Sequence, residues 1–323
     1  MLGLILLLQT LTIAVSGPAS SPEYLPLHVA AAEGLFQREG LRVSLRPTRA
    51  EPGAAEALAQ GQADLVATSL DAILRYGPRA RGAAPRLVFG LTAAPPVALV
   101  VPAAHAGTVR AIDDLAGTRV AVSSPGAPEH AWLGWLLARA GLSVAQVSIA
   151  SHGSRGIGAA VERAEVHAAL VAEPLAGRLL AGGQARLLAD LRTPAAVARA
   201  LGTATVNAAV FARADRMPGD ADLAALARAL LAAERRLDAE TADGLAARLG
   251  RRVTGPREEF ELRRSASRGV YLPDGLVTAE EVRETLALVR AHLPLPAAAR
   301  VPDPDEMLHT QALRRVLIPL PER

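Results

Sequence analysis

The stretch from Thr12 to Ser69 constrains the fold more than any other part of the sequence. It alternates hydrophobic runs typical of strands with helical patterns: strands at 11–15, 41–45 and 63–67, and helices at 23–36 and 54–60. Strands and helices that alternate at this spacing form right-handed β-α-β units around a parallel sheet. We therefore predict an α/β fold.

Small and polar residues follow each of these three strands. They are Ser16-Gly17, the loop from Pro47 to Gly53, and Thr68-Ser69. In open parallel sheets, ligands bind outside the carboxyl ends of the strands. Three such ends at one edge of a sheet predict a binding cleft.

Several short motifs in this stretch resemble a known family. The motifs are Tyr24-Leu-Pro-Leu-His-Val-Ala30, Glu33-Gly-Leu-Phe36, Glu39-Gly-Leu41, and Ala57-Leu-Ala-Gln-Gly61 followed by Asp64. They resemble the N-terminal part of the solute-binding proteins of nitrate, sulfonate, taurine and thiamine-precursor ABC importers. The resemblance covers roughly residues 10–290 and is weakest from Gly255 onward. It implies a two-lobed type II periplasmic-binding fold with a central cleft and a helical C-terminal extension. A purely structural interpretation stays open, since Gly34 and Gly40 also suit helix C-caps.

The length of 323 residues suits two lobes, and the later sequence supports a division. Prolines in Thr92-Ala-Ala-Pro-Pro96 separate two apolar strands, so we place a hinge near Thr92. The β-loop-α pattern then repeats, and residues 205–211 read as the antiparallel strand that closes the second lobe. We predict lobe 1 at 9–92 and 214–323, and lobe 2 at 93–213.

The composition excludes several function classes. All 35 basic residues are Arg, the net charge is only +3, and no basic run suggests nucleic-acid binding. The absence of Cys excludes disulfides, thiol nucleophiles and thiolate metal sites. There is no His-Glu-x-x-His, P-loop or Gly-x-Ser-x-Gly motif. We therefore expect no metal and no cofactor.

The first eight residues, Met1-Leu-Gly-Leu-Ile-Leu-Leu-Leu8, form an apolar run that is too short to span a bilayer. A secretory signal would also carry a basic segment before this run. Two interpretations stay open, a remnant of an export signal or an apolar lead-in to the first strand. The family resemblance favours export and thus a periplasmic or otherwise extracytoplasmic location.

The turn Ser123-Ser-Pro-Gly-Ala-Pro128 precedes a predicted helix at 129–140. Free N–H groups and the positive end of the helix dipole make such a turn an anion site. The resemblance implies that a similar Ser-Pro-Gly turn helps hold the anionic head in sulfonate binders. Here Pro128 lacks an N–H, and Glu129 adds a carboxylate to the first turn. An ordinary helix start explains the same two residues.

Acidic residues dominate the other predicted cleft positions. Glu23, Glu51 and Glu173 bring carboxylates, and Arg155 is the one arginine expected nearby. Surface carboxylates are a common alternative interpretation. The pattern favours an amine- or heterocycle-bearing solute over a sulfonate. The predicted ligand-binding residues are Ser16, Glu23, Tyr24, Thr68, Ser69, Thr92, Ser123, Ser124, Gly126, Ala127, His152, Glu173 and Asn207.

Two function classes follow. In the first, the chain is a non-enzymatic, monomeric binding protein that delivers a small organic solute to the membrane permease of an ABC importer. In the second, it is a cytoplasmic enzyme on the same fold, such as a menaquinone-pathway lyase. The pyrimidine-synthase branch is excluded, because its cysteine-associated motif has no counterpart here.

Overall fold

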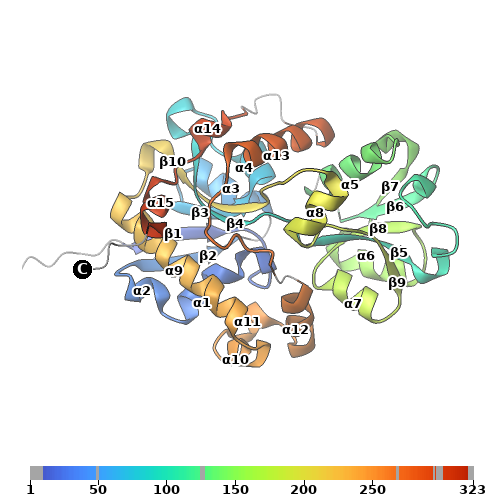
Figure 1. Cartoon of the computed structure of the whole chain (residues 1–323), viewed down its shortest axis with the longest axis horizontal. Helices are drawn as coiled ribbons and strands as arrows, with labels where there is room; N and C mark the ends of the chain where they lie inside the picture. Colours follow the sequence, from blue (N-terminus) through green and yellow to red (C-terminus); the bar gives the residue numbers. More distant parts are fainter. Residues whose placement is uncertain are drawn as a thin grey trace, which may run out of the picture.

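The computed structural model describes residues 10–48, 51–123, 128–266, 269–293, 295 and 301–318. The interpretation of residues 1–8 as a signal remnant therefore lies outside the described residues. Two five-stranded sheets lie side by side, each covered by helices (Figure 1). The predicted two-lobed α/β fold is confirmed.

The first sheet has the strand order β2-β1-β3-β10-β4. Its strands are β1 (Thr10–Val15), β2 (Arg42–Pro47), β3 (Leu65–Ser69), β4 (Pro85–Thr92) and β10 (Ala208–Arg213). Strand β1 is parallel to β2 and β3, while β10 is antiparallel to both β3 and β4. The ends of β1, β2, β3 and β4 therefore share one edge with the start of β10.

The second sheet has the strand order β7-β6-β8-β5-β9. Its strands are β5 (Val97–Pro102), β6 (Arg119–Val122), β7 (Ser148–Ser151), β8 (Ala168–Ala172) and β9 (Ala185–Asp190). Strand β6 is parallel to β7 and β8, and β5 is antiparallel to β8 and β9. Hence β6, β7, β8 and β9 end at the edge where β5 begins.

Helices cover both faces of the first sheet. Successive residues of a strand point to opposite faces; Ile13 and Val15 of β1 pack in the cluster with α1 (Leu25–Ala32), α2 (Leu35–Arg38) and α9 (Asp220–Ala239). Ala14 packs in another cluster with α3 (Glu51–Ala59), α4 (Leu70–Tyr76) and α13 (Ala279–His292). The C-terminal helices α14 (Pro304–Met307) and α15 (Gln311–Leu317) pack on β4 and α9.

Helices also cover both faces of the second sheet. Val100 and Val171 pack in the cluster with α6 (Gly153–Glu162) and α7 (Leu175–Ala181). Leu99 and Val120 pack with α5 (Pro128–Arg139) and α8 (Pro194–Leu201). Short 3-10 turns complete the described chain: η1 Pro22–Tyr24, η2 Arg81–Ala83, η3 Ala103–His105, η4 Asp113–Leu115, η5 Val144–Gln146 and η6 Ala214–Arg216.

Two helix predictions need correction. The single helix predicted at 23–36 is divided into η1, α1 and α2, because Gly34 adopts a left-handed conformation with φ of 67°. Apolar positions recur at helical spacing from Asp220 to about Arg251 in the sequence, but α9 ends at Ala239 and is followed by the separate helices α10 (Ala242–Ala246) and α11 (Arg251–Thr254). By contrast, Thr278-Ala-Glu-Glu281 has the sequence of a capping box, and this capping box is present at the start of α13.

The chain passes between the sheets at residues 93–96 and again at 202–207. The two crossings are hydrogen-bonded to each other, because Thr205 Oγ1 donates to Ala93 O at 2.9 Å. One strand assignment is wrong: residues 205–211 were assigned to the second lobe, whereas β10 lies between β3 and β4 of the first sheet. The return crossing is therefore complete before Ala208.

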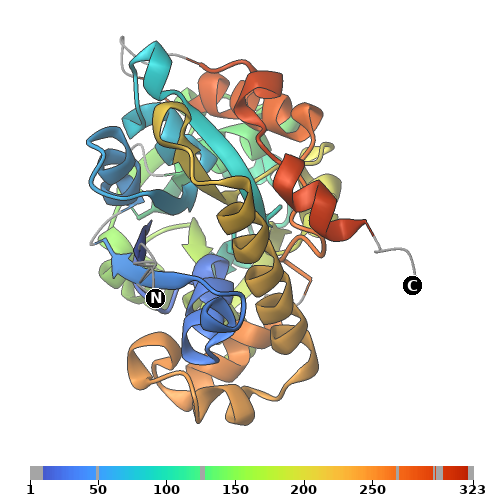
Figure 2. The ribbon, with the colours of Figure 1, turned by 90° about the vertical axis from the view of Figure 1, so that its left-hand side faces the viewer.

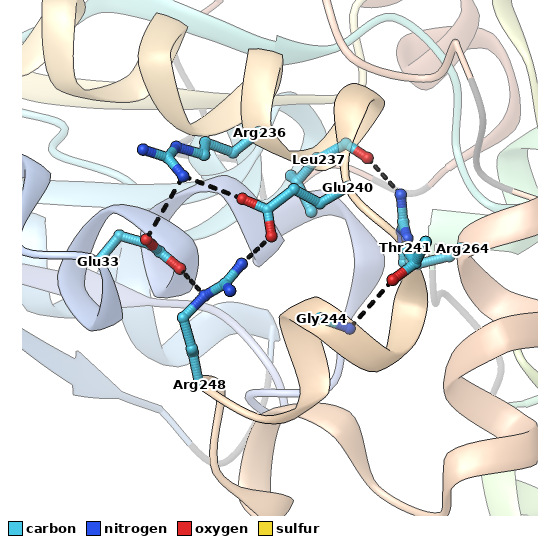
Figure 3. Close-up of polar contacts among 8 residues, drawn as sticks. All are labelled: Glu33, Arg236, Leu237, Glu240, Thr241, Gly244, Arg248 and Arg264. Atoms are coloured by element: carbon cyan, nitrogen blue, oxygen red, sulfur yellow. Dashed lines mark hydrogen bonds and ion pairs between the residues drawn. The ribbon is translucent and has the colours of Figure 1, made fainter.

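Helices α10, α11 and α12 (Arg257–Ala266) form a C-terminal extension beside α9 (Figures 1 and 2). Alternating charges fasten it: Glu33 and Glu240 each pair with both Arg236 and Arg248 (Figure 3). Arg264 of α12 donates to the carbonyl of Leu237 near the end of α9. The extension reaches from α9 to α7 of the second lobe, against which α12 packs. Within the described residues, no helix combines the length and apolarity that a membrane span requires.

Candidate ligand-binding cleft

Two sheet edges meet at the chain crossings. Strand β4 ends at Thr92 and β5 begins at Val97, so residues 93–96 directly connect the two edges. The edge of the first sheet carries Ser16, Ser69, Thr92 and Asn207, and the edge of the second carries Ser123, His152 and Glu173. The strand-end positions predicted from the sequence thus lie on two facing edges.

Polar side chains on the first edge bond to one another. Ser16 Oγ donates to Thr68 Oγ1 at 2.7 Å, and both residues are fully buried. Asn207 Nδ2 and the N–H of Ala208 each donate to Thr92 Oγ1 at 3.2 Å. These bonds fasten β1 to β3 and β10 to β4. Thr68 and Thr92 therefore shape the edge, and Ser69 begins α4 beside them.

Glu23 and Tyr24 differ in their environments. Tyr24 is 1% exposed and belongs to the hydrophobic core beneath α1. Glu23 precedes it in η1, where burial raises the pKa of the Glu23 carboxyl to about 7, although the positive charge of Arg263 opposes this rise. Glu23 is therefore poised between its neutral and charged forms at neutral pH.

Asp71, in the first turn of α4, belongs to this region and was missed from the sequence. It is buried, and its pKa is raised by burial and, to a smaller extent, by the negative charge of Glu129 on α5. A cavity of about 10 Å³ lies beside it, lined by Asp71, Ala131, Trp132, Val206, Asn207, Thr285 and Val289. The sequence signal was available, because Asp71 follows the strand end at Ser69 by two residues.

On the second edge, Glu129 turns back toward the end of β6. Its Oε1 accepts hydrogen bonds from the N–H of Ser123, at 3.3 Å, and from Ser123 Oγ. Ser151 Oγ donates to the carbonyl of Ser123 at 3.1 Å, which links β7 to the same point. The chain's own carboxylate thus binds donors at this strand end. The predicted contacts Ser124, Gly126 and Ala127 lie outside the described residues.

Glu173 is buried at the end of β8, and each of its two carboxylate oxygens accepts a hydrogen bond. Its Oε1 accepts from Arg192 Nη1 at 3.0 Å, and its Oε2 accepts from the N–H of Gly177 at 3.1 Å. Arg192 also binds Asp190 at 2.9 Å. Arg155 is the arginine that we predicted here from the sequence, but it is exposed on α6. The charge partner of Glu173 is Arg192, which follows a strand, β9, that was not predicted.

A second arginine, Arg263 of α12, was also missed. It is 2% exposed, and burial lowers the pKa of its guanidinium. Its Nη2 donates to the carbonyls of Val253 and Thr254 at 2.9 and 3.1 Å, at the end of α11. It interacts electrostatically with Tyr271, Glu173 and Glu23. Arg263 lies in the segment where the family resemblance is weakest.

His152 is a half-buried residue at the start of α6. Its imidazole acts electrostatically on Glu165 of the same lobe. Among the residues that the structure describes, no three side chains of the His, Cys, Asp or Glu type are placed to hold a metal ion together.

Comparisons with solved structures identify similar folds. A protein of Bordetella bronchiseptica RB50 is 25% identical, with a TM-score of 0.74 over 95% of this chain and 96% of its own. The alkanesulfonate-binding protein SsuA from Xanthomonas axonopodis pv. citri, bound to MOPS, is 22% identical, with a TM-score of 0.70 over 93% and 98%. The putative sulfonate ABC transporter's periplasmic sulfonate-binding protein SsuA from Methylobacillus flagellatus KT is 18% identical, with a TM-score of 0.70 over 96% and 94%.

The same fold also occurs in an enzyme. The desulfurization enzyme DszB is 17% identical, with a TM-score of 0.62 over 95% of this chain and 98% of its own. The fold alone therefore does not separate binding from catalysis.

The sequence also matches a protein-family model. The model described as NMT1/THI5 like matches residues 21–189, more than half of the 323 residues. Among curated proteins, none matches this sequence. The matched range begins in the loop after β1, includes the first crossing at 93–96, and ends within β9 of the second sheet. The chain therefore belongs to the NMT1/THI5-like family, as the resemblance of its opening motifs to solute-binding proteins implied.

Proposed function

We propose that this protein is the extracytoplasmic solute-binding component of an ABC importer, which captures a small organic solute and delivers it to a membrane permease. The solute binds between the two facing sheet edges, and the crossings at 93–96 and 202–207 act as the hinge between two lobes. Similarity to the periplasmic sulfonate-binding protein SsuA supports this role. The described polar residues of the two edges supply the donors and acceptors that such a solute needs.

The orientation of Glu129 carries the proposal for the solute class. From the first turn of α5, its carboxylate binds the N–H and hydroxyl of Ser123 at the end of β6. The start of α5 would otherwise stabilise an incoming anion. A second carboxyl, that of Asp71, lies within electrostatic range across the interface between the lobes. We therefore favour a solute with amine or N–H groups, such as an amine or aminoheterocycle, over a sulfonate.

Simple electrostatics sets the scale of this preference. Two like charges about 4 Å apart repel by about 4 kcal/mol at an effective dielectric constant of about 20. A sulfonate beside Glu129 would meet repulsion of this order, whereas an N–H group would gain a hydrogen bond to a charged acceptor, worth about 1.5–3 kcal/mol.

A ligand screen tests the proposal. Calorimetry and thermal unfolding would compare alkanesulfonates with amines and aminoheterocycles, using wild type, Glu129→Gln and, as a matched control, Glu162→Gln on the exposed surface of α6. We expect amines to stabilise wild type and the control, and to bind Glu129→Gln about tenfold more weakly. Stabilisation of wild type by sulfonates alone would overturn the proposed solute class.

The second candidate function is an enzyme on this fold, which the similarity to DszB supports. The two functions differ in what happens to the bound compound. A binding protein returns its solute chemically unchanged after prolonged incubation, while an enzyme returns product. Chromatography of the released ligand, together with fractionation of cells into periplasm and cytoplasm, separates the two.

A further inference from the structure

The side chain of Arg263 uses one nitrogen in structural hydrogen bonds and leaves another N–H group without an acceptor among the described residues. Its Nη2 binds the carbonyls of Val253 and Thr254, which fixes the guanidinium at the end of α11. Its Nε–H is buried and has no hydrogen-bond partner among the described residues. A buried donor without an acceptor is unfavourable. A hydrogen-bond acceptor from outside the described chain would therefore stabilise this N–H group.

Carboxyls of both lobes lie within electrostatic range of Arg263. Glu23 at the first edge and Glu173 at the second both act on it electrostatically. Glu173 does not accept from this Nε–H; its two oxygens accept from Arg192 and from the N–H of Gly177. Helix α12 itself packs against α7, which begins two residues after Glu173. The residues that surround Arg263 therefore include charged groups and a helix contact from both lobes.

A small cavity adjoins the guanidinium. Its volume is about 20 Å³, which is enough for a water-sized group, and it is lined by Pro22, Leu25, Leu237, Asp238, Arg263, Arg264 and Tyr271. The hydroxyl of Tyr271 is already used, since it donates to the carbonyl of Pro22 at 2.7 Å. Space therefore exists next to Arg263 for one atom group that accepts a hydrogen bond.

We infer that Arg263 is a specificity-determining residue of the proposed cleft and that its Nε–H binds an acceptor atom of the solute. This inference rests on the proposed function and narrows its solute class. The solute carries a hydrogen-bond acceptor, such as a carbonyl oxygen or a ring nitrogen, in addition to the N–H groups that face Glu129 and Asp71. Because Arg263 comes from the C-terminal extension, the specificity of the cleft depends on a segment outside both sheets.

Two matched probes and two matched variants test the inference. 2-Aminopyrimidine and aniline share an amino group on a six-membered ring, but only 2-aminopyrimidine has ring-nitrogen acceptors. The variant is Arg263→Lys, and the control is Arg257→Lys on the same helix, whose exposed arginine pairs with Asp243 and does not line this cavity. By calorimetry, we expect wild type and the control to prefer 2-aminopyrimidine by about tenfold, the usual effect of one hydrogen bond to a charged group.

In Arg263→Lys we expect that preference to fall to about threefold or less, with the affinity for aniline unchanged. A merely structural arginine would lower the affinity for both probes equally. A full tenfold preference in Arg263→Lys, or no preference in wild type, would overturn the inference.

Two further arms cover the other outcomes. If Arg263→Lys does not fold, hydrogen exchange of the wild-type segment 257–266 replaces it: greater protection by 2-aminopyrimidine than by aniline supports the inference, and equal protection contradicts it. If wild type binds sulfonates instead of amines, the proposed solute class fails. The same variants are then measured with the bound sulfonate, where a tenfold loss confined to Arg263→Lys supports a role for Arg263 and equal affinities refute it.

Discussion

Two contacts between the lobes differ in their chemistry. Where α5 meets α13, one hydrophobic cluster runs from the first sheet into the second, and the Trp135 ring meets His292 edge-on at 5.8 Å. Where α7 meets α12, the two helices belong to separate hydrophobic clusters. There the ion pair of Arg178 with Glu259 joins them at 3.4 Å, with side chains 52% and 33% exposed.

This difference indicates how the cleft opens. Burial of apolar surface stabilises by about 25 cal/mol per Å², whereas an exposed ion pair contributes about 0–1 kcal/mol. The α5–α13 contact is therefore costly to separate, and the α7–α12 contact is not. We expect the lobes to pivot about α5–α13 and the crossings, with the cleft opening beside α12.

The largest expected effect comes from a cavity in the hydrophobic cluster that spans both lobes. Leu133 of α5 is fully buried in the cluster that spans both sheets. Leu133→Ala should lower the free energy of unfolding by about 2–5 kcal/mol, measured by urea denaturation. Leu187→Ala on β9, where the side chain is 36% exposed, is the control and should change it by about 0.5 kcal/mol or less. A loss below about 1 kcal/mol for Leu133→Ala would argue against a shared core.

Local patterns in the sequence predicted most of the first sheet. The alternation at 12–69 located β1, β2 and β3, and the prolines after Thr92 located the first crossing. Positions at strand ends, such as Ser16 and Glu173, follow from the same reasoning, because parallel strands end at one edge. These predictions succeeded because each depends on residues that are close in sequence.

Charge pairing was not predictable in the same way. Arg192 and Arg263 were missed because they meet Glu173 and Glu23 only through the tertiary fold, Arg263 from an extension 240 positions after Glu23. The assignment of β10 failed for a related reason. An apolar run such as residues 205–211 predicts a strand, but its spacing does not say which of two sheets it joins.

A smaller effect on stability is expected from a methyl group added at Gly134, where α5 contacts α13. A Cβ on Gly134 of α5 would lie 2.7 Å from Nδ1 and 3.0 Å from Cβ of His292 on α13. Gly134→Ala should therefore destabilise the protein by about 1–3 kcal/mol, despite the higher helix propensity of Ala. Removing the ring with Gly134→Ala/His292→Ala should recover part of this loss, as a double-mutant cycle would measure. Strictly additive losses would mean that the two side chains do not compete for space.

The two contacts should respond oppositely to pH. Burial lowers the pKa of His292 in the folded protein below its ordinary value of 6.5. As the pH falls below 6.5, the unfolded chain therefore binds a proton at His292 more readily than the folded chain does, and the folded protein loses stability. Glu23, near α12, has its pKa raised from 4.5 to about 7, so stability is lost as pH rises through this range. Partial exposure of Glu23 limits its effect to about 1 kcal/mol.

Single variants separate these opposing slopes. Thermal unfolding between pH 4.5 and 7 should show a stronger loss on acidification in Glu23→Gln, because the compensating carboxyl is gone. His292→Gln should show the reverse, with stability that declines steadily as pH rises. If both variants keep the wild-type profile, neither group titrates with the assigned shift, and the pH dependence arises elsewhere.

The smallest effect belongs to the ion pair at the opening side. Arg178→Ala removes an exposed partner of Glu259, so the free energy of unfolding should fall by about 0.5 kcal/mol or less. Because an exposed pair is screened by salt, the difference from wild type should vanish at about 1 M NaCl, where the Debye length is about 3 Å. The matched variant Arg163→Ala breaks an exposed pair with Glu165 within the second lobe and should act similarly on stability. Only Arg178→Ala should weaken solute binding, by about twofold, because it alone removes a contact that forms when the lobes close. Equal affinities of the two variants would place the opening motion away from α12.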